Sequence, residues 1–87
     1  MNYNIIFSKN FKKKINNLEP WYREKIKKSI ILMSYWLFLW LDIKELNPKW
    51  NNKYRLRIWK YRIIYEKQDF NLMIFILEIW SRWDIYK

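Results

Sequence analysis

Cysteine and histidine are both absent from the 87 residues of the chain. Without cysteine the protein has no disulfide and no thiol nucleophile, and without either residue type the usual zinc sites are excluded. Histidine is also the side chain that ordinarily titrates near neutral pH, so an acid–base step would need another group. We therefore expect a protein that uses no metal and no cofactor.

Glycine is absent as well, although average usage of about 7% would place roughly six glycines in a chain of this length. The chain instead holds seven tryptophans. One of them, Trp59, falls in a two-residue gap between two alternating runs, where a hairpin turn needs positive φ and favours Gly, Asn or Asp. We hypothesise that UGA codons, read as glycine in the source, stand here as tryptophan. The alternative is a tryptophan-rich chain that uses the rings for packing or base stacking.

Long apolar runs are also missing. The longest, residues 30–41, has only Ser34 as an interruption, but its 12 residues fall short of the roughly 20 that a bilayer span requires. We interpret it as the buried end of a helix and the connection that follows. The first residues show no charged segment followed by an apolar one, so no secretory signal is predicted, and we expect a cytoplasmic protein with no membrane partner.

The charge balance is strongly positive, with 18 Lys and Arg against 8 Asp and Glu and a formal net charge of +10. A charge of this size favours a polyanionic partner such as nucleic acid. It does not by itself distinguish RNA, DNA, an acidic protein or a lipid surface. The length predicts one domain, residues 1–87, with a single core.

Two alternating runs, residues 54–58 and 61–66, are separated by two residues and predict a β-hairpin with Trp59-Lys60 as its loop. In this register Arg57 lies directly opposite Arg62. One face is apolar and the other is cationic, carrying Arg55, Arg57 and Arg62. Opposed like charges destabilise a strand pair, whereas a phosphate between two guanidiniums would stabilise it. The alternative is a solvated basic face.

The remaining pattern predicts an α+β fold. Residues 3–7 favour a strand, Ser8 can cap a helix over residues 9–18, and Glu19-Pro20 separates it from a second helix that should run antiparallel to the first. Residues 41–52 are loop-like, and residues 72–79 are nearly all apolar, which is typical of an interior strand. We expect an N-terminal strand, two helices and then an antiparallel meander.

Laid out in this way, the chain resembles the RelE/ParE toxin superfamily of type II toxin–antitoxin modules, and within it the RelE-like branch. The resemblance runs nearly end to end. It is carried by the N-terminal run of residues 3–9 with Phe11 and Lys13, by residues 42–46, by the hairpin of residues 54–58 and 61–66, and by Ile79, Arg82, Asp84, Ile85 and Tyr86. It implies a microbial-RNase-like fold that cleaves messenger RNA on the ribosome and is silenced by a cognate antitoxin.

The resemblance also implies roles for individual residues. Arg62 matches a phosphate-binding arginine, Arg82 an arginine after the last strand, and Tyr86 a tyrosine that stacks on a base. With Arg57 these form the expected catalytic set, and further RNA contacts are expected from Arg55, Lys53, Lys44 and Lys60. The best-known member has lysines where this chain has Arg55 and Arg57.

The proton-transfer group is left open. An arginine effectively cannot lose its proton, so Arg55 is a poor general base. Many relatives have His where this chain has Ser81. The nearby carboxylates that could take a proton are Glu66, Glu78 and Asp84, but we expect each of them to form a structural salt bridge.

Two alternatives from other functional classes stay open. One is a ParE-like inhibitor of DNA gyrase, against which the arginine set argues. The other is a basic RNA-binding protein that has lost cleavage. Relatives also commonly have glycine at the positions of Trp59, Trp40 and Trp80 and, less securely, of Trp36 and Trp50, which is in line with the UGA hypothesis.

Overall fold

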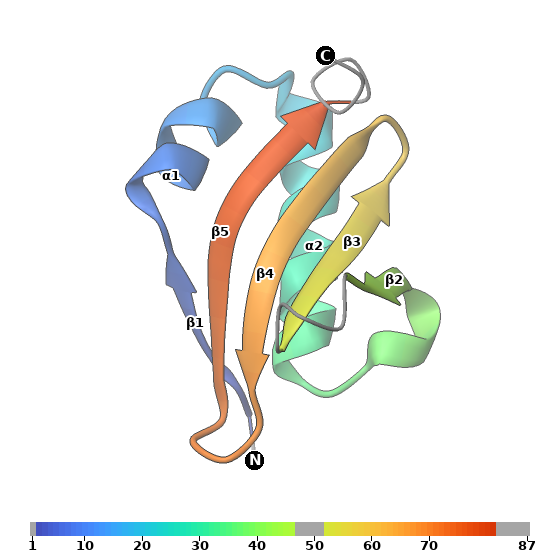
Figure 1. Cartoon of the computed structure of the whole chain (residues 1–87). Helices are drawn as coiled ribbons and strands as arrows, with labels where there is room; N and C mark the ends of the chain where they lie inside the picture. Colours follow the sequence, from blue (N-terminus) through green and yellow to red (C-terminus); the bar gives the residue numbers. More distant parts are fainter. Residues whose placement is uncertain (1, 47–51, 82–87) are drawn as a thin grey trace.

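The computed structural model describes residues 2–46 and 52–81, and within them it is α+β as predicted. In chain order the elements are β1 (Asn4–Phe7), α1 (Lys9–Ile15), α2 (Pro20–Ser34), a 3-10 helix η1 (Phe38–Trp40), β2 (Asp42–Glu45), β3 (Lys53–Ile58), β4 (Tyr61–Gln68) and β5 (Met73–Ser81). The five strands form one sheet in the order β1-β5-β4-β3-β2 (Figure 1). Strand β1 pairs parallel with β5, and the other neighbours are antiparallel. The antiparallel meander is therefore confirmed.

The β3–β4 hairpin has the register that its spacing predicts. Ile58 pairs with Tyr61 and Arg57 with Arg62, so the loop consists of Trp59 and Lys60. Alternation along the strands then sends Leu56 and Ile63, both fully buried, to one face of the sheet and the arginines to the other. The hairpin thus fixes which face is core and which is cationic.

The helices cover the apolar face of the sheet, and Figure 1 shows α2 running behind β3 and β4. Helix α2 begins with Pro20, which suits the first helical position because its missing N–H has no intrahelical partner there. Its residues Ile26, Ile30 and Met33 recur at helical spacing and join the hairpin residues in one core cluster. The opposite face of the sheet carries no helix among the described residues.

Two sequence-based boundaries were wrong. Helix α1 ends at Ile15 rather than at Leu18, because the next two residues, Asn16 and Asn17, form a turn, and asparagine favours turns over helix interiors. Residues 42–45, predicted as loop, form the edge strand β2 against β3. A four-residue strand with three charged residues gives no apolar alternation to recognise, and short charged strands are usual at sheet edges.

No helix in the described part of the chain is long and apolar enough to cross a membrane. Residues 2–46 and 52–81 also contain no group of three or more carboxylate, imidazole or thiol side chains that could hold a metal ion.

Candidate nucleic-acid interface

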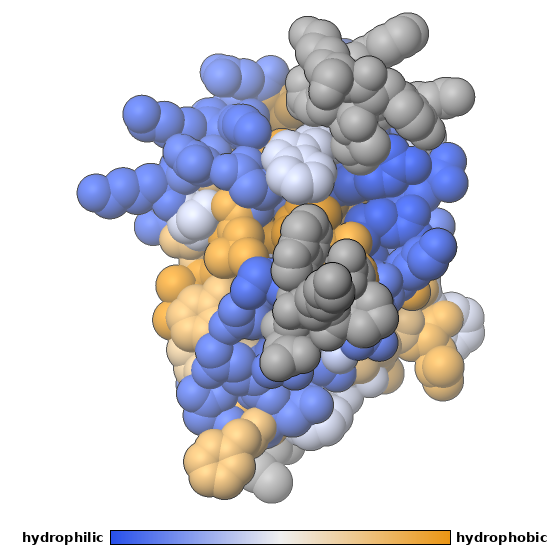
Figure 2. Space-filling model, in the orientation of Figure 1, coloured by the Kyte–Doolittle hydropathy of each residue, from blue (hydrophilic) through white to orange (hydrophobic). Residues whose placement is uncertain are grey.

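Arg57 and Arg62 lie side by side on the sheet face that the helices leave open. They are directly paired across β3 and β4, with Arg57 exposed and Arg62 half-buried. Figure 2, drawn in the orientation of Figure 1, looks onto this face and shows hydrophilic side chains over β3 and β4 and apolar ones toward β1. No described carboxylate stands between the two residues in the strand register. The exposed Arg57 side chain donates one hydrogen bond, from its Nε to the Trp59 carbonyl at 3.3 Å.

Arg55 and Asp42 form an ion pair beside these two arginines. The Arg55 Nη2 lies 3.3 Å from Asp42 Oδ1, and the Arg55 side chain is much less exposed than that of Asp42. The Arg55 Nε is buried and has no hydrogen-bond partner among the described residues. In the strand register Asp42 lies directly opposite Arg57, although its ion pair is with Arg55.

Asp42 is a candidate residue that the sequence-based reasoning missed. It lies on β2, whose residues the sequence predicts as a loop, and only the pairing of β2 with β3 brings its carboxylate to the cationic face. The signal that could have found it is the acid at the start of residues 42–46, a segment already part of the family resemblance.

The three lysines that are expected to contact RNA differ in their partners and in the side of the sheet on which they lie. Lys53 shares the open face but its Nζ lies 2.6 Å from Glu66 Oε1 in an ion pair. Lys44 is exposed and pairs with Arg55 in the register of β2 and β3. Lys60 lies over the rings of Tyr22 and Tyr61, at 5.5 and 5.4 Å from their centroids, and so belongs to the helix side of the hairpin loop.

The carboxylates expected to be structural are indeed paired where the structure describes them. Hydrogen bonds donated by Lys53 and Gln68 lower the pKa of Glu66. Glu78 accepts from Lys14 Nζ and Asn10 Nδ2, each at 3.0 Å. Arg82, Asp84 and Tyr86 lie outside the described residues, so their predicted roles stay predictions.

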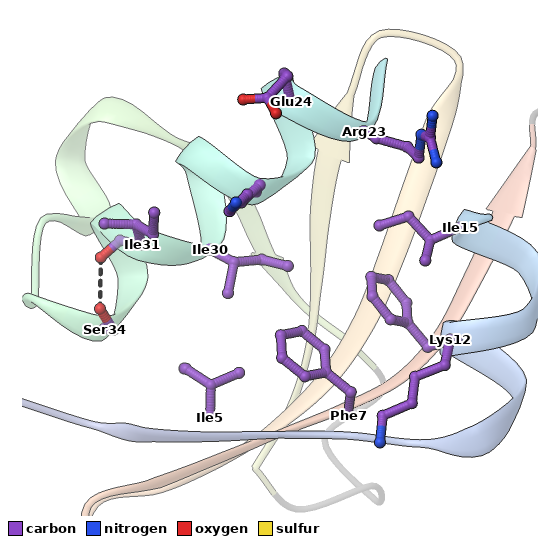
Figure 3. Close-up of a pocket in the computed structure, with 11 residues that line it drawn as sticks. Ile5, Phe7, Lys12, Ile15, Arg23, Glu24, Ile30, Ile31 and Ser34 are labelled. Atoms are coloured by element: carbon purple, nitrogen blue, oxygen red, sulfur yellow. Dashed lines mark hydrogen bonds between the residues drawn. The ribbon is translucent and has the colours of Figure 1, made fainter. Parts of the chain in front are cut away.

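The structure also contains an apolar groove on the helix side of the sheet, on the other face from Arg57 and Arg62 (Figure 3). It lies between β1, α1 and α2 and has a volume of about 560 Å³. Its apolar lining consists of Ile5, Phe7, Phe11, Ile15, Ile30 and Ile31. Cationic side chains stand around it, namely Lys12, Arg23 and Lys27, with Glu24 as the one acidic lining residue.

Comparison with solved structures places this geometry among known folds. The RelB–RelE antitoxin–toxin complex from Methanococcus jannaschii contains a chain that is 30% identical, with 93% of this chain and 94% of that chain covered and a TM-score of 0.79. The RelE–RelB complex from Pyrococcus horikoshii OT3 matches at 22% identity over 94% and 97% of the two chains, with a TM-score of 0.83. The DinJ–YafQ complex from E. coli shares the fold at 12% identity over the full length of both chains, with a TM-score of 0.79.

Sequence comparison gives the family directly. Among curated proteins none matches the chain at a significant level. The family model described as the ParE toxin of the type II toxin–antitoxin system parDE, however, matches residues 5–86. The chain therefore belongs to the ParE toxin family, within the RelE/ParE superfamily of toxins of type II toxin–antitoxin systems.

Proposed function

We propose that this toxin is a metal-independent endoribonuclease of the cytoplasm that cleaves messenger RNA on the ribosome. The observation that carries the proposal is the direct opposition of Arg57 and Arg62 on a sheet face that no helix of residues 2–46 or 52–81 covers. A folding role does not account for two like charges placed across a strand pair. Binding of a phosphodiester between them does.

The reaction needs three contributions from the protein, namely in-line alignment of the reacting groups, stabilisation of the developing charge, and proton transfer. The ribose 2′-oxygen attacks the adjacent phosphorus in line, the bond from phosphorus to the 5′-oxygen breaks, and a cyclic phosphate remains. Arg57 and Arg62 hold the phosphate and stabilise the negative charge that develops on it, because guanidinium groups match phosphate oxygens in a fixed fork. Arg82 is proposed as a third phosphate ligand, and Tyr86 as the residue that fixes the base by stacking.

We assign the first proton transfer to Asp42. Its carboxylate lies on the arginine face, and among the described residues only Oδ1 is engaged, with Arg55 Nη2 at 3.3 Å. A positioned carboxylate can accept the 2′-hydroxyl proton as attack proceeds, and water supplies the proton that the departing 5′-oxygen takes up. Arg55, which cannot act as a base, is in this scheme the residue that positions Asp42.

Substitution of Arg62 tests the proposal. We expect Arg62→Ala to lower the rate of cleavage of ribosome-bound message by about a hundredfold or more, measured by primer extension, because a preorganised charge stabiliser is lost. Arg62→Lys keeps the charge without the fork and should retain part of the rate. Circular dichroism reports whether each variant is folded.

Lys28→Ala provides the control, since Lys28 is an exposed residue of α2 on the helix layer. It should cleave like the unchanged protein. A folded Arg62→Ala variant with full cleavage activity would remove Arg62 from the site, and RNA binding without any cleavage by the unchanged protein would favour the non-catalytic alternative.

One further candidate function is inhibition of DNA gyrase, because the matching family model is that of the ParE toxin. A gyrase inhibitor would block DNA supercoiling and leave ribosome-bound message intact. A supercoiling assay run beside the primer extension separates these two functions, and we expect inhibition to be absent.

We also propose that the cognate antitoxin binds the groove between β1, α1 and α2. An apolar floor with a cationic rim fits an amphipathic segment that carries acidic side chains on its flanks. Ile31 is 47% exposed there and is not one of the buried core residues, so its substitution should leave the core packing unchanged. Ile31→Glu should remain toxic but escape neutralisation by the co-expressed antitoxin, because a carboxylate is then buried at the contact.

Leu39→Glu is the matched control for the groove, since Leu39 is fully exposed on η1. This variant should still be neutralised. Loss of toxicity in Ile31→Glu, or its full neutralisation, would contradict the placement of the antitoxin without affecting the nuclease assignment.

A further inference from the structure

Two tryptophans have backbone conformations that proteins normally reserve for glycine. Trp36 has φ of 69° and Trp59 has φ of 55°, both in the left-handed region. A Cβ atom makes this region unfavourable, and a bulky residue there is a genuine outlier. The other left-handed residues described are Asn52 and Leu72, and Asn is the residue type that tolerates the conformation best after glycine.

Trp36 stands at the end of α2 in a Schellman motif. Its N–H donates to the Met33 carbonyl at 3.1 Å, and the Leu37 N–H donates to the Leu32 carbonyl at 2.9 Å. These are the two bonds that define the motif, and they place Trp36 at the first position beyond the cap. Glycine is the usual residue at that position because it has no Cβ penalty in the left-handed region.

Trp59 stands in the loop of the β3–β4 hairpin. It is the first of the two loop residues, and among these two only Trp59 has a positive φ. That pattern is typical of a type II′ turn, which has glycine at the first central position. Two unrelated motifs, a helix end and a hairpin turn, therefore demand glycine and hold tryptophan.

Tryptophan and glycine are connected through one codon. UGA is read as tryptophan in some genetic codes and as glycine in others. The chain has seven tryptophans and no glycine. Its commonest residues, Ile and Lys, have AU-rich codons, which indicates an AU-rich gene. At the tryptophan positions the codon UGA is therefore expected rather than UGG. We infer that positions 36 and 59 are specified by UGA and that the source cell inserts glycine at both.

The inference bears on the arginine face through position 80. Trp80 pairs with Arg62 in the register of β4 and β5, so its ring occupies the same open face. A glycine there would leave the Arg62 guanidinium open on the side of β5. The backbone argument for positions 36 and 59 does not depend on the nuclease proposal.

The gene and the protein from the source cell test the inference together. We expect UGA at codons 36 and 59, and we expect the tryptic peptide of residues 29–44 to have the mass of a chain with glycine at position 36. UGG at either codon overturns the inference. So does UGA with a peptide mass that retains tryptophan.

Stability measurements give a second test that needs no source cell. Glycine and alanine both remove the ring, but only glycine relieves the left-handed backbone. Trp36→Gly and Trp59→Gly should therefore each have a folding equilibrium constant about fivefold larger than the matching alanine variant.

Ile31 supplies the matched control because it is half-exposed and lies inside α2. At this position the order should reverse, with Ile31→Ala about fivefold more favourable than Ile31→Gly, since glycine is a poor residue inside a helix. Alanine variants as stable as the glycine variants at positions 36 and 59 would overturn the inference.

Discussion

At the scale of single residues, the arginines of the cationic face differ in their partners. Arg57 is exposed and donates from its Nε to the Trp59 carbonyl at 3.3 Å, whereas Arg55 forms an ion pair with Asp42. An exposed guanidinium can bind a ligand, and one paired with a carboxylate can position it. We accordingly assign phosphate binding to Arg57 and Arg62 and proton transfer to the Asp42–Arg55 pair.

This division predicts opposite effects on binding and on chemistry. Asp42→Asn removes a negative charge from a cationic surface, so the Kd for RNA should stay equal or fall. The same change removes the proton acceptor, so single-turnover cleavage should slow by about a hundredfold or more. Binding and cleavage that weaken in parallel would make Asp42 a structural residue only.

Two buried tyrosines predict the behaviour of the fold in alkali. Burial raises the pKa of Tyr65, and burial together with the hydrogen bond that the Tyr3 hydroxyl donates to Asp69 raises that of Tyr3. In the unfolded chain both ionise near their ordinary pKa of about 10. Below that pH the two tyrosine hydroxyls are neutral in the folded and the unfolded state. Above it the unfolded state is favoured, because there the two hydroxyls lose their protons while in the folded state they keep them.

The free energy of unfolding should therefore decline as the pH rises above about 10, as measured by urea denaturation at a series of pH values. Tyr3→Phe keeps the ring and removes one ionisable group, so its decline should be shallower. An equal decline in both proteins would mean that Tyr3 does not contribute.

Residues of the site differed in how far the sequence could predict them. The opposition of Arg57 and Arg62 followed from a period of two and a two-residue loop, which fix both face and register. Asp42 did not follow, because its place depends on the long-range pairing of β2 with β3. Local spacing carries no information on that pairing.

At the scale of elements, Ser8 connects α1 to the sheet. Its Oγ accepts from the Phe11 N–H at 3.1 Å as the helix N-cap and donates to the Leu77 carbonyl at 2.6 Å. One hydroxyl thus satisfies a free helix N–H and fixes α1 beside β5. A short helix of seven residues depends on such a connection because it has little packing of its own.

Ser8→Ala should lower the free energy of unfolding by about 1–2 kcal/mol, since both the cap and the bond to β5 are lost. Ser34→Ala is the control, because within the described part of the chain the Ser34 hydroxyl bonds only to the Ile31 carbonyl of its own helix. The Ser34→Ala variant should lose less than half as much free energy of unfolding as Ser8→Ala. Equal losses in thermal denaturation would show that the connection to β5 contributes nothing.

The elements that the sequence predicted well are those that bury an apolar face. Strand β5, helix α2 and the hairpin each have a clear apolar pattern, because each contributes to the core cluster. Strand β2 contributes Ile43 only at the margin of that cluster, and its register comes from β3. Its four residues alone could not predict it.

At the scale of the whole molecule, the charge of +10 predicts that RNA binding weakens as salt rises. Each phosphate contact to a single strand adds about 0.7 to the slope of log K against log salt. Replacing Arg57 and Arg62 together with Gln should therefore reduce the slope by about 1.4 in a fluorescence titration with a short oligoribonucleotide.

Lys27→Gln combined with Lys28→Gln is the matched control, because it removes the same charge from the exposed side of α2. Its slope should stay close to that of the unchanged protein. A slope that falls equally in both double variants would indicate diffuse attraction to the whole surface rather than contacts at the arginine face.

The opposed pair of Arg57 and Arg62 has a consequence for how the chain reaches its native state. Folding forces two cations together, and a polyanion that bridges them binds the native chain better than the unfolded one. Any such ligand shifts the equilibrium toward the native chain by mass action. Short RNA should therefore raise the yield of refolding from urea, so that a ligand of the arginine face would also assist the folding of the toxin.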